Sequence, residues 1–439
     1  MFWFELLVVL LAIFVGARLG GIGLGVMGAI GLAILTFGFH LQPTAPPIDV
    51  MLMIVAVVTA AGALQAAGGL DYLVHLAEKA LRKNPKHITF LGPFVTYVFT
   101  LVAGTGHVSY SVLPVIAEVA TDSKIRPERP LSISVIASQQ AITASPISAA
   151  TVALLGMLTP FGIGLTDILS ICIPATLTGV LVGALFALRM GKDLDKDPEY
   201  LKRLEDGLVE PLAHTEEGGR TVPTSAKISV GLFLLGAVLI VFFGSFDVLR
   251  PAWIVDGAEK RLGMPETIEI VMLSIAALIL IFGKVNVAKV AKGSVFSAGM
   301  QAVIAIFGIA WMGDTFFKGN MPFLESSLMA MVTSYPWLFA FALFILSILL
   351  YSQAATVRAL VPFGIGLGLP AASIIAMFPA VNGYFFIPNY PTIVAAINFD
   401  RTGTTRIGRY VLNHSFMIPG LVATAVAIAV GFLLATIIL

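Results

Sequence analysis

Small hydroxyl and amide side chains gather at four interruptions in otherwise apolar segments, and such side chains can hydrogen-bond to an anion without carrying charge. The candidate substrate-binding residues are Thr105, Gly106, His107, Thr143, Ser145, Pro146 and Ser148 in the first half, and Ser352, Gln353, Thr356, Arg358, Asn382, Pro388, Asn389 and Thr392 in the second. Other polar residues nearby include Ser138, Gln139 and Gln140. An interrupted helix exposes backbone N–H groups and a partial positive charge at each new N-terminus. The clusters therefore predict a site for a small anion, whereas any single serine or threonine is better explained by a bond to its own helix backbone.

Four ionisable residues need separate explanations, because charge inside a membrane segment is costly and usually functional. Arg358 follows the second interrupted hairpin tip, where it could reach a carboxylate or extend to the outer membrane surface. His107 could donate a hydrogen bond to the substrate, carry a coupled proton or have only a structural role. Asp314 is expected to cap or pack a helix rather than couple an ion, and Glu118 is expected to be solvated.

No residue pattern in the sequence indicates catalysis, a metal or a cofactor, so we expect no enzyme activity. The chain lacks a Gly-Lys-Ser or Gly-Lys-Thr phosphate loop, which argues against ATP-driven transport by this polypeptide. Its 6 histidines are dispersed without metal-ligand spacing. Cys172 is the single cysteine, so neither an intrachain disulfide nor a cysteine-based metal cluster is expected.

The composition is that of an integral membrane protein. Hydrophobic residues make up 58% of the chain, charged residues 12%, and the mean hydropathy is +0.96. About ten apolar runs approach or reach the roughly 20 residues with which a helix crosses a bilayer, and they lack the alternation of barrel strands. The first run begins at Met1 with no basic stretch before it, which favours a signal anchor over a cleaved signal peptide. We therefore expect an all-α polytopic membrane protein.

The same order of segments occurs in residues 1–188 and 228–439, which are joined by a hydrophilic linker at 189–227. Each half is predicted to contain three spans, a re-entrant helical hairpin, a discontinuous helix and a final span. The spans are 2–17, 21–39, 50–67, 166–188, 228–246, 268–283, 298–317 and 410–438; the hairpins are 88–120 and 336–368; the discontinuous helices are 131–158 and 371–397. Leu70–Asn84 is expected to form an interfacial helix. Paired interruptions in two halves of opposite orientation are typical of the binding site of a transporter with inverted repeats.

The positions of the basic residues support this topology. Most of the 26 lysines and arginines fall in the loops that begin at residues 18, 68, 121, 189, 284 and 398, which share one side of the membrane if both hairpins are re-entrant. A hairpin that crossed fully would reverse every later loop and spread the basic residues over both faces. The bias of positive charge toward the cytoplasm therefore predicts that both termini are periplasmic.

Six motifs distributed along the whole chain resemble those of a known family. They are Gly16-Ala17-Arg18-Leu19-Gly20-Gly21-Ile22, Gly68-Gly69-Leu70-Asp71, Gly104-Thr105-Gly106-His107, Ala144-Ser145-Pro146-Ile147-Ser148, Tyr351-Ser352-Gln353-Ala354-Ala355 and Asp400-Arg401-Thr402-Gly403-Thr404-Thr405-Arg406-Ile407-Gly408. The chain is similar in these motifs to the Dcu family of anaerobic C4-dicarboxylate transporters. The resemblance implies a bacterial inner-membrane protein that exchanges fumarate, malate or aspartate for succinate. It also implies a fold like that of the divalent-anion/sodium symporters, although their Ser-Asn-Thr signature is absent from both hairpin tips.

The working hypothesis is an alternating-access antiporter that holds a dicarboxylate between the two hairpin tips and the two helix breaks. A sodium- or proton-coupled dicarboxylate symporter with the same fold is the main alternative, and an anion channel is another. The basic loop at Arg401–Arg409 suggests a membrane sensor kinase as a partner, which is compatible with transport. The lipid bilayer is the expected environment, a homodimer is expected from the family alone, and no nucleic-acid partner is expected.

Overall fold

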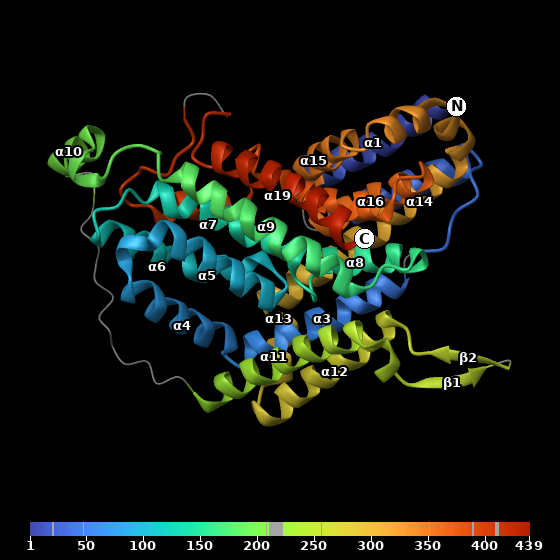
Figure 1. The fold of residues 1–439 in the computed structure, drawn as a ribbon, viewed down its shortest axis with the longest axis horizontal. Helices are drawn as coiled ribbons and strands as arrows, with labels where there is room; N and C mark the ends of the chain where they lie inside the picture. Colours follow the sequence, from blue (N-terminus) through green and yellow to red (C-terminus); the bar gives the residue numbers. More distant parts are fainter. Residues whose placement is uncertain are drawn as a thin grey trace.

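The computed structural model describes residues 1–439 except 20, 21, 47, 208, 210–222, 256, 351, 389 and 409–411. Nearly all of the regular structure in this part of the chain is helical (Figure 1). The exception is an antiparallel pair of short strands, β1 (Ala252–Val255) and β2 (Ala258–Arg261), in which Trp253 pairs with Lys260. The all-α fold class predicted from the sequence is confirmed.

In the first half the helices are α1 (Phe2–Leu19), α2 (Gly23–Ala33) with its π-helical extension η1 (Ile34–Gly38), α3 (Ile48–Ala66), α4 (Gly69–Lys83), α5 (Ile88–Ala103), η3 (Gly106–Val108), α6 (Ser109–Asp122), α7 (Glu128–Gln140), η4 (Ala141–Ala144), α8 (Ala149–Leu158) and α9 (Leu165–Ala187). The linker contains α10 (Pro198–Glu205). The second half contains α11 (Thr224–Ser245), α12 (Met264–Phe282), α13 (Val287–Lys292), α14 (Ser294–Ser334), α15 (Leu338–Leu350), α16 (Gln353–Gly366), α17 (Ala371–Met377), η8 (Phe378–Phe385), α18 (Pro391–Phe399) and α19 (Met417–Ile438).

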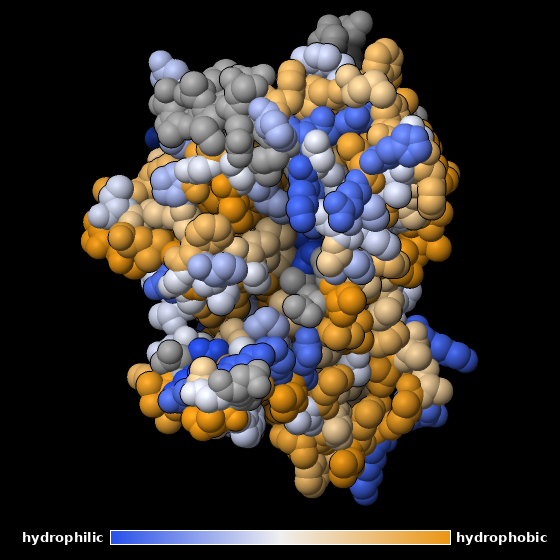
Figure 2. Space-filling model, turned by 90° about the vertical axis from the view of Figure 1, so that its right-hand side faces the viewer, coloured by the Kyte–Doolittle hydropathy of each residue, from blue (hydrophilic) through white to orange (hydrophobic). Residues whose placement is uncertain are grey.

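Within the described residues, six helices are long and apolar enough to cross a membrane, or up to seven if α3 and α4 together count as one bent span. Four shorter apolar helices, Phe2–Gly16, Gly25–Gly38, Leu338–Ile348 and Ala371–Phe385, lie in segments that the sequence also assigned to the membrane. The total of about ten spans therefore stays a prediction. Large apolar side chains such as Phe4, Val238 and Leu433 are exposed. Figure 2 shows hydrophobic side chains over the flanks of one face and hydrophilic ones toward its middle, as expected where lipid surrounds the protein.

The apolar core is divided into two clusters. The smaller cluster joins α1, α2 and α14 through residues such as Val9, Leu32 and Met312. The larger cluster contains most of the other helices, among which α5, α7, α9 and α19 lie side by side (Figure 1). Helix α16 contributes residues to both clusters, so it lies on the boundary between them.

Helices α2 and α14 approach so closely that their backbones touch. A side chain at Gly308 would place its Cβ 1.8 Å from the carbonyl oxygen of Gly25. In a lipid environment helix pairs gain stability from such close van der Waals packing, which requires small residues at the contact. The glycine-rich start of α2 thus serves helix packing.

Two segments differ from the sequence prediction. The span expected to end at residue 317 continues without interruption to Ser334 as part of α14. The polar residue Asn320 does not end the helix, because its amide donates hydrogen bonds to Glu5 Oε2 (2.7 Å) and to the Phe316 carbonyl (3.0 Å) and so remains buried. The β1–β2 pair was not predicted; it joins α11 to α12 where a plain loop was expected.

Candidate substrate-binding site

The tip between α5 and α6 begins where Gly104 adopts a left-handed conformation (φ 69°) that ends α5. A Cβ at Gly104 would lie 3.0 Å from both Cγ1 and the carbonyl oxygen of Ile147, so this tip packs directly on the break between η4 and α8. The hydroxyl of Ser145 donates to the Leu101 carbonyl (2.7 Å) and fastens the break to the last turn of α5. We call residues 104–108 the first tip.

At the first break, between η4 and α8, the side-chain hydroxyl groups form hydrogen bonds with nearby backbone groups. Thr143 Oγ1 donates to the Gln140 carbonyl (2.8 Å), and Ser148 Oγ donates to the Ile142 carbonyl (2.6 Å). Ser148 is also the N-cap of α8 and accepts a hydrogen bond from Thr151 N (3.1 Å). Pro146 is buried in the turn between η4 and α8. These hydroxyls therefore stabilise the interruption itself, as N-caps and local side-chain bonds do elsewhere.

The second half repeats this construction. Ser352 caps α16 by accepting from Ala355 N (3.2 Å), and Thr356 Oγ1 donates back to the Ser352 carbonyl (2.8 Å). The second break lies between η8 and α18; within η8, Gly383 N donates to Ser347 Oγ of α15 (2.8 Å), so the segment before this break is also fastened to the helix that precedes α16. We call the start of α16, residues 352–356, the second tip.

Packing between the halves follows a matching pattern. Helix α6 packs on α18, and α16 packs on α8, so the second helix of each pair contacts the last part of the broken segment in the other half. The final helices α9 and α19 pack along each other. The two tips and the two breaks are thereby brought toward one region.

Four amides and one hydroxyl from both halves form a buried hydrogen-bonded group, which we call the amide cluster: Gln139, Gln140, Gln353, Asn382 and Thr424. Gln353 Nε2 donates to Gln139 Oε1 (2.8 Å) and to Asn382 Oδ1 (3.2 Å). Asn382 Nδ2 donates to Gln140 Oε1 (3.2 Å), whose Nε2 donates to Thr424 Oγ1 (3.0 Å). The cluster links α7, α16, η8 and α19 without a formal charge.

Gln139 is the residue on which both tips converge. It accepts the hydrogen bond from Gln353 of the second tip, and a Cβ at Gly106 of the first tip would lie only 2.5 Å from its Nε2. Gln139 and Gln140 are not among the binding residues predicted from the sequence, although two consecutive glutamines just before an interrupted apolar helix were an available signal.

The other described candidates differ in burial and in hydrogen bonding. Thr392 is buried, and its Oγ1 has no hydrogen-bond partner within the described residues. Arg358 is 3% exposed, and in the same part of the chain its Nε and Nη2 are also without a partner. Thr105 is half-buried in the first tip, and Pro388 is buried just before α18.

Two candidates lie outside the part of the chain that can be described. Asn389 is not described at all, and the same holds for the side chain of His107. Their predicted roles remain predictions.

Two ionisable residues differ from part or all of what was expected. Asp314 lies well inside α14, which excludes the capping role, while its helix-packing role stays a prediction. Glu118 is not solvated, because its carboxylate accepts a hydrogen bond from Arg82 Nη2 (2.8 Å) and its side chain is only 15% exposed. This pair joins the amphipathic helix α4, which lies within one residue of the predicted 70–84, to α6.

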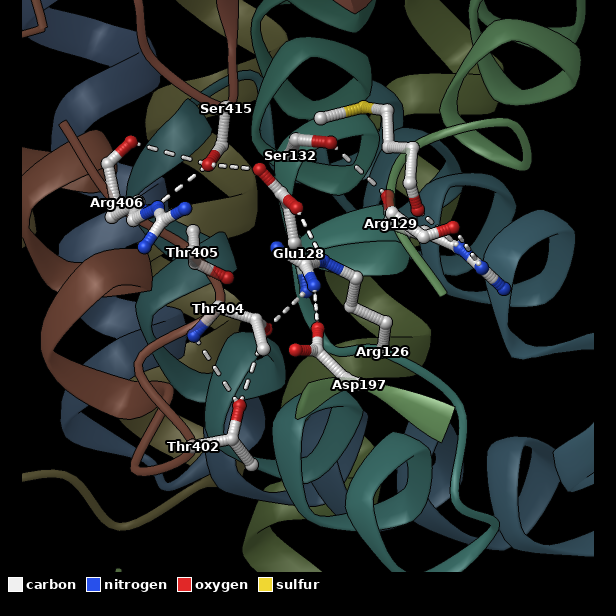
Figure 3. A network of polar contacts seen from close by, with 12 residues as sticks. Arg126, Glu128, Arg129, Ser132, Asp197, Thr402, Thr404, Thr405, Arg406 and Ser415 are labelled. Atoms are coloured by element: carbon white, nitrogen blue, oxygen red, sulfur yellow. Dashed lines mark hydrogen bonds and ion pairs between the residues drawn. The ribbon is translucent and has the colours of Figure 1, made fainter. Parts of the chain in front are cut away.

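A second polar network lies at the end of the molecule near α10 (Figure 3). Arg126 forms ion pairs with Asp197 of the linker and with Glu128 Oε2 (2.6 Å). Glu128 in turn accepts from Ser415 Oγ (2.7 Å). The loop before α7, the linker and the loop before α19 are therefore held together, a connection between distant segments that the sequence did not predict.

In the basic loop that suggested a protein partner, Arg406 pairs with Glu199 of α10. The Asp400 carboxylate accepts hydrogen bonds from Thr402, Thr404 and the backbone of Thr405. Among the described residues, no group of three histidine, cysteine, aspartate or glutamate side chains could hold a metal ion.

The whole chain, residues 1–439, matches the model of a family described as anaerobic C4-dicarboxylate membrane transporters, DcuA_DcuB. It is 45% identical over 436 residues to the C4-dicarboxylate transporter DcuA of Wolinella succinogenes, covering 99% of both chains. It is 46% identical to DcuA of Escherichia coli K12, with 98% of each chain covered. It is 43% identical to the anaerobic C4-dicarboxylate transporter DcuB of Escherichia coli O6:H1, covering 99% of this chain and 98% of that one.

The fold is similar to that of the YdaH transporter of Alcanivorax borkumensis, whose crystal structure is described as having an unusual topology. The TM-score is 0.57 at 15% sequence identity, and the match covers 99% of this chain and 96% of the other. At this identity the likeness concerns the fold alone. Together with the apolar helices, the full-length family match shows that this multi-pass membrane chain belongs to the DcuA/DcuB family of anaerobic C4-dicarboxylate transporters.

Proposed function

We propose that the protein exchanges C4-dicarboxylates across the bacterial inner membrane by alternating access, taking up fumarate, malate or aspartate in return for succinate. The observation that carries the proposal is the convergence of both tips on Gln139 within a buried cluster of neutral amides. The names of the relatives supply the substrate class, since they are called C4-dicarboxylate transporters. In this proposal both hairpins are re-entrant, the halves are inverted repeats, and both termini are periplasmic.

A neutral amide site suits a carrier that must release what it binds. Amide N–H groups and helix N-termini can donate hydrogen bonds to a carboxylate, but each is weaker than a charge-assisted bond from lysine or arginine. The cluster contains four side-chain amides and is at most 7% exposed at any residue, so a bound carboxylate would be screened from water. A substrate can then displace amide-to-amide bonds such as that between Gln353 and Gln139. Because the amides are neutral, no unpaired charge remains in the site when the substrate leaves.

Exchange of one dianion for another moves no net charge, so the cycle needs no energising ion. The Ser-Asn-Thr signature of the sodium symporters is absent from both tips, which favours exchange over the sodium-coupled alternative. A proton-coupled cycle is the second candidate, because His107 lies in the first tip.

Counterflow in proteoliposomes tests the function. We expect rapid uptake of labelled succinate into vesicles loaded with fumarate, little uptake into empty vesicles, and no dependence on sodium or proton gradients. Uptake that needs an ion gradient, or that proceeds equally into empty vesicles, contradicts the proposal.

Gln353→Ala tests the site. In the structure the Gln353 amide donates to Gln139 and Asn382, and in the proposal it turns to the substrate; removing this donor should weaken dicarboxylate binding by about 1–3 kcal/mol. Gln301→Ala is the matched control, because Gln301 is an exposed glutamine on α14. Equal affinity in the two variants would place the site elsewhere.

A further inference from the structure

Arg358 is a buried arginine whose hydrogen-bonding capacity is largely unused. Only 3% of its surface is exposed, and neither Nε nor Nη2 has a hydrogen-bond partner among the residues that the structure describes. An arginine stays protonated under all physiological conditions and brings five N–H donors with it. A buried guanidinium without a partner is strongly unfavourable, and native proteins normally place a carboxylate or phosphate against it.

The nearest acid does not complete the pair. Asp314 on α14 is close enough to interact electrostatically with Arg358. No ion pair within hydrogen-bonding range joins them among the described residues, and Asp314 Oδ1 is itself buried without a partner. Hydrogen-bonding atoms of both side chains therefore remain without partners where α16 packs on α14, among the described residues.

That interface separates the two apolar clusters. Ala355 and Ala359 of α16 pack into the small cluster with α1, α2 and α14, whereas Ala354, Val357 and Val361 belong to the large one. Arg358 lies between these two sets on the same helix, and Asp314 is on the α14 side. Any displacement of α16 against α14 must carry the guanidinium past the carboxylate.

We infer that Arg358 is the charge that makes exchange obligatory: a substrate carboxylate neutralises it, and the unloaded carrier cannot move α16 past α14 because the guanidinium then lacks an anion. Asp314 offsets part of this charge when no substrate is bound. This inference rests on the proposed exchange function and assigns its coupling to one residue. The ligand group is the carboxylate of the dicarboxylate substrate.

The test compares two fluxes in vesicles loaded with labelled succinate at a saturating concentration. Efflux into buffer that contains fumarate measures exchange, and efflux into substrate-free buffer measures return of the empty carrier. For the unaltered protein we expect the second flux to be a small fraction of the first. In Arg358→Gln the ratio of empty-buffer efflux to exchange should rise on the order of tenfold, because an uncompensated buried charge has been removed.

Three further variants give the result its meaning. Arg358→Lys keeps a positive charge and should keep the ratio low. Lys318→Gln changes an exposed cation on α14 and should leave both fluxes unchanged. Asp314→Asn should lower the ratio of empty-buffer efflux to exchange below that of the unaltered protein. The reason is that this variant removes the carboxylate that partly offsets the Arg358 charge when no substrate is bound. Opposite shifts in Arg358→Gln and Asp314→Asn cannot arise from general loss of folding.

The inference is overturned if folded Arg358→Gln exchanges with an unchanged ratio, or if it loses both fluxes at saturating load. If Arg358→Gln does not fold, Asp314→Asn decides alone, and an unchanged or increased ratio overturns the inference. Failure of the unaltered protein to exchange succinate for fumarate would instead refute the proposed function, so the two failures are distinguishable.

Discussion

Replacing Gly106 by alanine should damage the contact on which both tips converge. The new Cβ would lie 2.5 Å from Nε2 and 3.1 Å from Cδ of Gln139. Carbon and nitrogen atoms in van der Waals contact are about 3.5 Å apart, so the amide of Gln139 must move by about 1 Å. The bond from Gln353 Nε2 to Gln139 Oε1 is 2.8 Å long, and a shift of that size stretches it beyond hydrogen-bonding range.

The size of the effect follows from the burial of the two amides. In the proposed site the displaced amides of Gln139 and Gln353 no longer meet the substrate carboxylate, and a hydrogen bond lost at a buried group costs about 1–3 kcal/mol. Gln139 is 1% exposed and Gln353 is 7% exposed, so water cannot replace the bond easily. We therefore expect the half-saturating dicarboxylate concentration in exchange to rise by roughly 5-fold to 150-fold.

The assay is labelled succinate exchange in proteoliposomes, with the amount of folded carrier measured separately. Gly231→Ala is the matched control, because Gly231 lies in α11 with nothing within 4 Å of the added Cβ. There alanine should raise helix stability by up to about 1 kcal/mol and leave exchange unchanged. On a Gln139→Ala background, Gly106→Ala should cost little more, since the obstructing amide is gone. Equal affinities for Gly106→Ala and Gly231→Ala would refute the placement of the site at Gln139.

Two further predictions concern the network near α10 and the loop before α19. Asp197→Asn should destabilise the fold by about 1–3 kcal/mol, because the Arg126 guanidinium, 10% exposed, loses one of its two carboxylate partners and keeps Glu128; thermal unfolding should show a drop that exposed Asp195→Asn lacks. Burial lowers the pKa of His414 below its usual 6.5, and Nδ1 accepts from Phe416 N (3.2 Å), which only the neutral ring can do. The contribution of His414 to stability is therefore complete above pH 6.5 and declines as the pH falls below it. His414→Gln should reduce the loss of unfolding free energy below pH 6.5, whereas His75→Gln, at an exposed position, should not. Equal curves of stability against pH for the unaltered protein and both variants would contradict this prediction.

Element positions could be predicted because they depend on local pattern. The interruption at residues 104–108 is set by Gly104, which must adopt a positive φ, and the start of α16 is set by the Ser352 cap. Apolar runs identified most of the membrane segments for the same reason. The pattern failed at α14, because the run of apolar residues stops at Lys318 while the helix is continued by the buried bond between Asn320 and Glu5.

The composition of the site could be predicted only as a class. Hydroxyl and amide residues at the breaks indicated neutral hydrogen bonding, and the amide cluster has that character. The sequence could not show which side chains form local hydrogen bonds and which form long-range ones. Thr143 and Ser148 donate to backbone carbonyls within six residues, whereas Gln353 donates to Gln139 across 214 residues of the chain. Long-range pairings of this kind depend on how the two halves pack, and that information is not local.

The two proposals assign binding and coupling to different chemistry. Amides can exchange one hydrogen-bond partner for another at little net cost, so the amide cluster would be able to bind and release a carboxylate in either orientation of the proposed carrier. An arginine does not give up its charge, so in the proposed cycle the substrate carboxylate neutralises Arg358 while α16 moves. A site made only of amides would allow the empty carrier to return, and a site made of several arginines would hold the dianion too tightly to release it. The proposed division between a neutral amide cluster and one buried arginine would allow rapid release and still prevent the empty carrier from crossing.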